Sequence, residues 1–251
     1  MNKTLAGKVA LVTGGSRGLG AAIAVRLAEL GADVAFSYVA SGEKAAAVAE
    51  TLQQKGVRAL AIQNDQGDPF AAQSLVDTVI GHFGKLDILV NNAAIAVQGH
   101  RIDDPEADFA ELDRQWRVNV LGVVALTRAA AQKITDGGRI VFVGSGLGGR
   151  VAFPTVTEYS ATKAALVGYA KGASRDLGPR NITVNVVQPG IMPTDMAAAA
   201  GEVLPPGITD TLSIARIATL EEVAASITFL VGPEAGYITG AVLDISGGYQ
   251  A

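Results

Sequence analysis

Lys8-Val-Ala-Leu-Val-Thr-Gly-Gly-Ser-Arg-Gly-Leu-Gly20 is a short apolar run that stops at a glycine-rich turn. The next residues, Ala21 to Leu30, show a helical pattern that ends at Gly31, so the order is strand, turn and helix. Glycines let a backbone approach a ligand closely, and free N–H groups at a helix start can bind phosphate. The stretch therefore predicts either a phosphate-binding turn or a turn that only packs the helix tightly on the strand.

The same alternation of strand and helix continues along the chain. Apolar runs that predict strands occupy residues 33–38, 57–62, 86–90, 139–143, 181–187 and 241–245. Helical patterns occupy residues 43–55, 68–83, 105–133, 157–177 and 221–231. Asp68 followed by Pro69 has the form of an N-cap and a first helical residue. Strands that alternate with helices of crossover length predict an α/β fold, a doubly wound parallel sheet with helices on both faces, whose ligands bind outside the carboxyl ends of the strands.

Size and composition favour one globular domain inside the cell. The 251 residues are 49% hydrophobic and 18% charged, which suits a single domain over residues 1–251 with a large core. The formal net charge is −4 and Lys and Arg form no cluster, so we expect no nucleic acid and no membrane surface as partner. The chain has no Cys, and His82 and His100 stand alone, so no metal site is predicted. No apolar run approaches the roughly 20 residues that span a bilayer, and we expect a cytoplasmic protein.

Residues 192–218 differ from the rest of the chain because prolines and glycines interrupt a mixture of Ala and Thr. The interruptions are Pro193, Gly201, Pro205, Pro206 and Gly207. We interpret the segment as a mobile lid over a site, with a passive surface insertion as the alternative.

Tyr159 and Lys163 lie four residues apart in the predicted helix 157–177, and therefore on one face of it. A fixed cation nearby lowers the pKa of a phenol from its usual value near ~10, so that the phenol can exchange a proton with a reacting oxygen. Ser145, in the small-residue loop after the strand 139–143, offers a second hydrogen-bond donor. Taken alone, the Tyr-Lys spacing would also suit an ordinary amphipathic pair on a solvated face.

Several separated motifs, in this order, resemble those of the classical short-chain dehydrogenase/reductase family. They are Thr13-Gly-Gly-Ser-Arg-Gly-Leu-Gly20, Asn91-Asn-Ala-Ala94, Asn119 within Val118-Asn-Val, Ser145, Tyr159-x-x-x-Lys163, and Gln188-Pro-Gly190 followed by Thr194. The resemblance extends from Lys8 to Tyr249. It implies a single-domain Rossmann-type sheet, a nicotinamide dinucleotide, a homotetramer, and a catalytic tetrad of Asn119, Ser145, Tyr159 and Lys163.

The chain departs from the family pattern at three places. Ala94 replaces a usual Gly, and its Cβ could crowd the adenine-side ribose. The interval from Ser145 to Tyr159 is one residue longer than the commonest spacing, which puts the extra residue in the loop 146–157. The turn Ile214-Ala-Arg-Ile-Ala218 lacks a Gly that many relatives carry after the Arg.

For ketone reduction, Ser145 would hydrogen-bond the substrate carbonyl while Tyr159 donates its proton as hydride arrives from the nicotinamide. Lys163 would lower the pKa of Tyr159 and, by resemblance, hold the nicotinamide ribose. Asn119 would fix a water that relays protons, or serve as a packing amide at a helix kink. Thr194, together with the backbone of Ile191, would bind the carboxamide, a role compatible with a helix N-cap.

The end of the second strand carries no carboxylate until Glu43, and a carboxylate there would favour NAD over NADP. Arg17, the hydroxyls of Tyr38 and Ser41, and Lys44 as a second cation would bind a 2′-phosphate, so NADP(H) is the predicted cofactor. Asp65 would accept a hydrogen bond from the adenine amino group. The full predicted cofactor site is Gly14, Ser16, Arg17, Gly18, Leu19, Gly20, Tyr38, Ser41, Asp65, Gln66, Asn92, Ala93, Ala94, Tyr159, Lys163, Pro189, Gly190, Ile191 and Thr194.

The loop 146–157 and the segment 192–218 supply mostly apolar side chains to the predicted substrate site, which favours an apolar ketone or aldehyde. That site is Ser145, Leu147, Val151, Phe153, Tyr159, Met192, Met196 and Leu204. The sequence thus predicts an NADP(H)-dependent ketoreductase, similar to 3-oxoacyl-acyl-carrier-protein reductases or to carbonyl reductases. The alternatives are a nucleotide-binding regulatory protein without turnover and a structural subunit. An intact tetrad argues against both, because pure binding has no chemical need of it.

Overall fold

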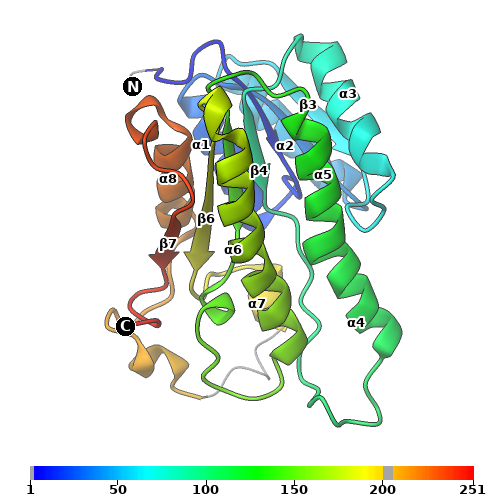
Figure 1. Ribbon diagram of the computed structural model, residues 1–251, viewed down its shortest axis with the longest axis vertical. Coiled ribbons are helices and arrows are strands. Elements are labelled where there is room, and N and C mark those ends of the chain that lie inside the picture. The colour runs from blue at the N-terminus through cyan, green and yellow to red at the C-terminus, as the bar shows by residue number, and fades with distance from the viewer. Residues whose placement is uncertain (1–2, 200–205) are drawn as a thin grey trace.

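The computed structural model describes residues 3–199 and 206–251, and its centre is one parallel sheet of seven strands (Figure 1). The strand order is β3-β2-β1-β4-β5-β6-β7. The strands are β1 Val9–Val12, β2 Asp33–Tyr38, β3 Ala59–Gln63, β4 Ile88–Asn91, β5 Arg139–Val143, β6 Thr183–Pro189 and β7 Val242–Ile245. Every strand pair is parallel, and the inner strands are buried on both faces, which explains why they are continuous Val, Ile and Leu runs.

Helices cover both faces of the sheet, as the sequence predicts. The helices are α1 Gly18–Glu29, α2 Gly42–Gln54, α3 Ala71–Phe83, α4 Phe109–Trp116, α5 Gly122–Ala131, α6 Thr157–Leu177, α7 Asp195–Ala199 and α8 Leu220–Val231. One core cluster joins α1, α2 and α8 to the sheet, and a second joins α3, α5 and α6 to its other face. None of the described helices combines the length and the apolar character that a bilayer span requires.

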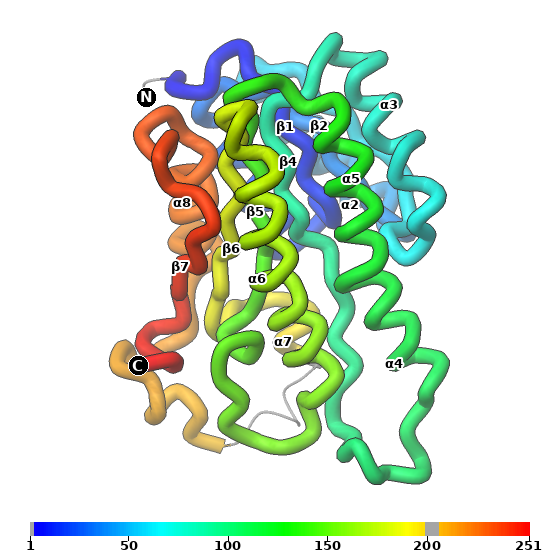
Figure 2. Tube along the Cα trace, viewed as in Figure 1, coloured from blue at the N-terminus to red at the C-terminus, as the bar shows by residue number. Residues whose placement is uncertain are grey.

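The order of the strands reverses between β1 and β4: β2 and β3 lie on one side of β1, and β4 to β7 lie on the other. Doubly wound sheets bind ligands at this position. The loops that follow these two strands are joined by hydrogen bonds. The Oγ1 of Thr13 accepts from the main-chain N–H groups of Asn92 and Ala93, at 3.0 and 2.9 Å. Figure 2 shows α7 and the last residues of the chain at the same end of the sheet, beyond the strand ends. Segments from distant parts of the sequence therefore meet at this end of the sheet.

Two helix starts differ from the sequence prediction. The helix predicted from Asp68 begins at Ala71, because the Asp68 side chain accepts from the N–H of Phe70 and forms a separate turn. The long helix predicted from Pro105 begins at Phe109, where Asp108 is the N-cap and accepts from two N–H groups of the first turn. It is also interrupted by a π-helical turn, residues Arg117–Leu121, between α4 and α5.

Candidate active site

A cavity of about 520 Å³ opens at the carboxyl ends of the strands. Its walls are the loops after β1 to β6, together with α6, α7 and the residues that follow β7. Every residue of the predicted cofactor site lines this cavity, from Gly14 in the turn after β1 to Thr194 before α7. Its size is typical of pockets that hold small molecules and cofactors.

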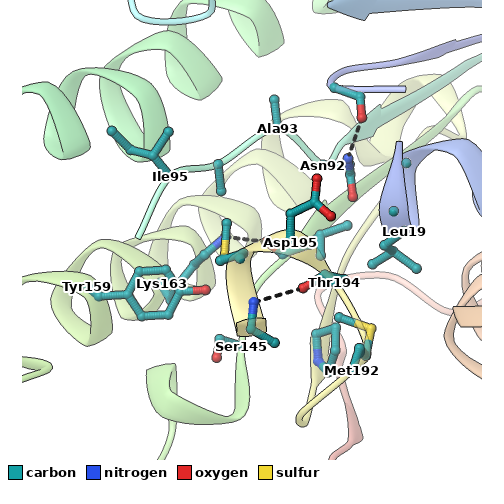
Figure 3. A pocket seen from close by; sticks show the side chains of 18 of the residues that line it. Leu19, Asn92, Ala93, Ile95, Ser145, Tyr159, Lys163, Met192, Thr194 and Asp195 are labelled. Atoms are coloured by element: carbon teal, nitrogen blue, oxygen red, sulfur yellow. Dashed lines mark hydrogen bonds between the residues drawn. The ribbon is translucent and has the colours of Figure 1, made fainter. Parts of the chain in front are cut away.

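Ser145, Tyr159 and Lys163 form a polar group in this cavity. Ser145 follows β5, and Tyr159 and Lys163 lie one turn apart on α6, where they are 7% and 3% exposed. Tyr159 is hydrogen-bonded to Ser145, and the Nζ of Lys163 lies 5.7 Å from the centroid of the Tyr159 ring. Figure 3 shows the three side chains together on the side of the cavity opposite Leu19. The four-residue spacing of Tyr159 and Lys163 thus places both side chains with Ser145 in one cluster of hydrogen-bond donors.

The effect of Lys163 on Tyr159 differs from the sequence prediction. Burial raises the pKa of Tyr159 to about 12, and the hydrogen bond with Ser145 counters this only in part. Burial also lowers the pKa of Lys163 to about 8, and its ammonium donates to the carbonyl of Val143 at 2.9 Å. Burial thus dominates the pKa of Tyr159 in this arrangement, and the phenol is not shifted downward as the sequence predicts. The phenol keeps its proton at neutral pH.

The lowered pKa of Lys163 predicts a pH dependence of stability. Between about pH 8 and pH 10 the folded chain has released a proton that the unfolded chain still binds, so the free energy of unfolding rises with pH, by at most about 1.4 kcal/mol per pH unit. The raised pKa of Tyr159 acts in the opposite direction, but only above about pH 10. In thermal unfolding, the free energy of unfolding of the wild type should increase relative to that of Lys163→Met as the pH rises through this window. A difference that stays constant with pH would contradict the assignment.

Asn119 lies in the π-helical turn and is 1% exposed. Its Oδ1 accepts from the N–H of Ile95 and its Nδ2 donates to the carbonyl of Ile95, both at 2.9 Å. The Nδ2 also donates to the Oγ1 of Thr162 at 3.2 Å. The side chain thus joins the loop after β4 to α6, and it does not line the cavity. This geometry corresponds to the packing amide at a helix kink that the sequence left open.

The first turn of α1 is built to receive an anion. Gly18, Leu19 and Gly20 form this turn and line the cavity. Arg17 is the N-cap residue, its side chain makes no capping hydrogen bond, and the turn contains no acidic residue. The main-chain N–H groups of a first helical turn have no partner inside the helix, so this end attracts phosphate. A Cβ at Gly20 would lie 2.2 Å from the carbonyl oxygen of Gly14, so only glycine fits. These residues fit the diphosphate of a dinucleotide.

Arg17 has a partner that the sequence did not predict. Its Nη1 lies 2.7 Å from the Oδ2 of Asp195, in an ion pair whose side chains are 60% and 65% exposed. Asp195 is the first residue of α7, and the Oγ1 of Thr194 accepts from an N–H inside this helix, as an N-cap does. The pair joins the glycine-rich turn to the segment 192–218. A 2′-phosphate would therefore compete with Asp195 for Arg17.

Two charged residues that the sequence predicts near the adenine and the 2′-phosphate, Asp65 and Lys44, differ from that prediction. The Oδ2 of Asp65 already accepts from Arg114, at 3.2 Å, so an adenine amino group would share that carboxylate. Lys44, the predicted second cation, is exposed and does not line the cavity. Gln66 is 7% exposed, and its amide donates to the carbonyl of Ala93 at 2.9 Å. Gln66 therefore fixes the loop after β4.

The predicted substrate site is partly realised. Leu147, Phe153, Met192 and Met196 line the cavity with Ser145 and Tyr159. Val151 does not line the cavity, and it is 54% exposed. Leu204 lies outside the described residues. The sequence analysis missed several lining residues whose local pattern carries no signal of a site: Ile95, Gln98, Ile208, Leu212, Ser246 and Tyr249.

The sheet order and the glycine-rich turn at the crossing of β1 and β4 define a dinucleotide-binding fold of the Rossmann type. Residues 14–250 match the family model described as Enoyl-(Acyl carrier protein) reductase. The fold is similar to that of a short-chain dehydrogenase from Burkholderia cenocepacia solved in complex with NADP. That chain is 46% identical, the TM-score is 0.93, and the match covers 99% of this chain and 100% of the other. This protein belongs to the short-chain dehydrogenase/reductase family of oxidoreductases.

Two curated relatives match over almost the whole length. One is a 3-oxoacyl-acyl-carrier-protein reductase of Staphylococcus aureus, 37% identical, with 96% of this chain and 97% of the relative covered. The other is a cyclic-di-GMP-binding biofilm dispersal mediator protein of Escherichia coli, 39% identical, with 98% of both chains covered. One fold thus carries both a reductase and a protein named for nucleotide binding.

Proposed function

We propose that this protein is an NADPH-dependent ketoreductase. The observation that carries the proposal is the hydrogen bond of Ser145 with the buried Tyr159 beside the buried Lys163, inside the same cavity as the cofactor residues. A nicotinamide bound there would supply the hydride. Ser145 and Tyr159 would hold the carbonyl oxygen of the substrate, and Tyr159 would give that oxygen its proton. Lys163, with its pKa near 8, would return a proton to the phenolate.

The substrate class is an apolar ketone, free or as a 3-oxoacyl thioester. Support comes from the apolar side chains at this end of the cavity, Leu147, Phe153, Met192 and Met196. We also propose that the segment 192–218 is a lid, since α7 joins the glycine-rich turn through Asp195. Oxidation of NADPH, followed by nicotinamide absorbance with a panel of ketones and 3-oxoacyl thioesters, tests the function. Turnover of at least one class is the expected result, and binding of NADPH without turnover of any of them would contradict it.

The alternative is a regulatory protein that binds a nucleotide without turnover, and the name of the Escherichia coli relative favours it. The two roles differ in what Tyr159 does. A binding protein would show the same affinity for cyclic-di-GMP with Phe at this position and no NADPH oxidation in the wild type. Titration with cyclic-di-GMP alongside the ketone panel separates the two.

Cofactor preference gives a second prediction. Arg17→Ala should weaken NADPH binding about tenfold or more and leave NADH affinity nearly unchanged, because only NADPH carries the 2′-phosphate. Asp195→Asn should strengthen NADPH binding, since it removes the carboxylate that competes for Arg17. Tyr38→Asp should shift preference toward NADH. Fluorescence titration of each variant with both cofactors measures the dissociation constants. Equal weakening of both cofactors by Arg17→Ala would mean that Arg17 only supports the turn.

We further propose a cytoplasmic homotetramer. Large apolar side chains are exposed on two faces, one on α4 and the π-helical turn and one on α8 and β7. They are Phe109, Leu121, Phe229 and Val242. α4 and α5 follow one another through the π-helical turn, and α6 lies beside them in front of the sheet (Figure 1). Burial of such faces favours assembly, and the mass by light scattering at micromolar concentration tests it.

A further inference from the structure

Tyr249 lies in the segment 246–251, which follows β7 and reaches back to the cavity. It is 7% exposed, although it stands only two residues before Ala251. Its ring lines the cavity and contacts the loop after Ser145, where a Cβ added at Gly146 would lie 3.3 Å from its Cδ1. None of the motifs in the sequence accounts for a buried aromatic residue at this place.

The loop after Ser145 is attached to Tyr249 at three points. The N–H of Ala152 donates to the Oη of Tyr249 at 3.2 Å. The guanidinium of Arg150 donates to the carbonyl of Tyr249 and lies 5.3 Å from the ring centroid, in cation–π contact. Gly146 packs against the ring. Arg150, the one cation of the loop 146–157, thus has a structural partner in Tyr249.

The segment 246–251 is itself fixed to the sheet. The amide of Gln250 donates to the Oε1 of Gln188 in β6 at 2.8 Å and to the Oδ1 of Asp244 in β7 at 3.2 Å. A Cβ at Gly149 would lie 2.2 Å from the Oε1 of Gln250, so the loop and this segment are in close contact. Through these contacts, Tyr249 and Gln250 hold the loop in a fixed position relative to the sheet.

The loop has other signs of being held in one conformation. The Oγ of Ser145 accepts from the N–H of Leu147 at 3.2 Å, so the first residues of the loop and Ser145 move together. Thr155 has a φ of 71°, which a β-branched residue rarely adopts, and its carbonyl accepts from the N–H of Gly99 at 3.0 Å. Displacing the loop would thus displace both Ser145 and the wall formed by Phe153.

We propose that Tyr249 is a positioning and specificity-determining residue: it fixes the loop 146–153, and its ring limits the bulk of the ketone that reaches Ser145. The inference rests on the proposed ketoreductase function and names a residue that sets its substrate range. Tyr249 does not touch the reacting atoms in this account. It acts through the loop that carries Ser145 and through the wall of the cavity.

The test compares Tyr249→Ala, Tyr249→Phe and Arg150→Ala with Tyr237→Ala, a control at a fully exposed tyrosine. Steady-state kinetics with NADPH use 3-oxoacyl thioesters of short straight and long branched acyl chains. Tyr249→Ala should raise the ratio of kcat/KM for the bulky over the small substrate about tenfold, because space is added to the wall. Tyr249→Phe should keep this ratio and raise KM severalfold for both, because the acceptor for Ala152 is lost. NADPH affinity should not change in any variant.

A second measurement separates failure of this inference from failure of the proposed function. Hydrogen exchange of the loop 146–153 should be faster in Tyr249→Phe and Arg150→Ala than in the wild type, and unchanged in Tyr237→Ala. If the wild type reduces no ketone, the proposed function fails, and exchange still decides whether Tyr249 fixes the loop. The inference is overturned if exchange in the loop is unchanged. It is also overturned if Tyr249→Ala lowers kcat/KM equally for both substrates.

Discussion

Tyr159→Phe is expected to lower kcat for ketone reduction by about 10² to 10⁴-fold and to leave NADPH affinity unchanged. Burial keeps the phenol protonated at neutral pH, and its hydrogen bond with Ser145 places that proton where the carbonyl oxygen would be held. Phe fills the same volume in a site that is 7% exposed, so the cavity should keep its shape. Steady-state kinetics on an accepted ketone, together with fluorescence titration of NADPH, separate the chemical step from binding.

A matched control is available on the same helix. Tyr169 lies on α6 away from the cavity and packs edge-to-face on Phe142, with ring centroids 6.0 Å apart. Tyr169→Phe should therefore change kcat little. If Tyr159→Phe turned over as fast as this control, the proton would come from another group and the proposed mechanism would be wrong.

Gly122→Ala is expected to destabilise the fold by about 3 kcal/mol, which lowers Tm by about 10 °C for a chain of this size. Gly122 is buried at the start of α5, directly after the π-helical turn. A Cβ there would lie 1.8 Å from the carbonyl oxygen of Gln66. That atom is main chain and cannot rotate away, so either α5 or the loop after β3 must move. Calorimetry of wild type and variant measures the shift.

Gly81→Ala is the control for this substitution. Gly81 lies on the exposed side of α3, and nothing stands within 4 Å of an added Cβ. Because Ala forms helix better than Gly by up to about 1 kcal/mol, this variant should raise Tm by a few degrees. Similar Tm values for both variants would show that the contact at Gly122 relaxes without cost.

The strands were predictable because burial on both faces of the sheet makes them continuous apolar runs. The predicted bounds of β2, β5 and α6 are those of the structure, since each is a strong local pattern of apolar residues. The starts of α3 and α4 were predicted too early, because Asp68 and Pro105 have local turn chemistry that propensity alone does not separate from a cap. The π-helical turn has no local signal, since it depends on Asn119 reaching Ile95.

The site, like the fold, was predictable where the signal is local and not where it depends on residues distant in the sequence. The cofactor residues all line one cavity because most of them lie just after a strand of the predicted sheet, and the sheet brings the strand ends together. The partners of Arg17 and of Arg150 could not be predicted, since they lie 178 and 99 residues away along the chain. The direction of the Tyr159 pKa shift differs from the prediction because burial raises it, and the spacing of Tyr159 and Lys163 does not reveal how deeply the phenol is buried.

The central claim is that this cavity transfers hydride from NADPH to a carbonyl carbon. The most direct measurement uses NADPH labelled with deuterium at the transferring position, in each of the two stereochemical forms, with a ketone from the panel. The account predicts an alcohol that carries deuterium at the carbinol carbon from one of the two forms, and formation of this product at least about 10²-fold more slowly in Tyr159→Phe. An unlabelled product from both forms, or bound NADPH with no alcohol from any ketone, would contradict it.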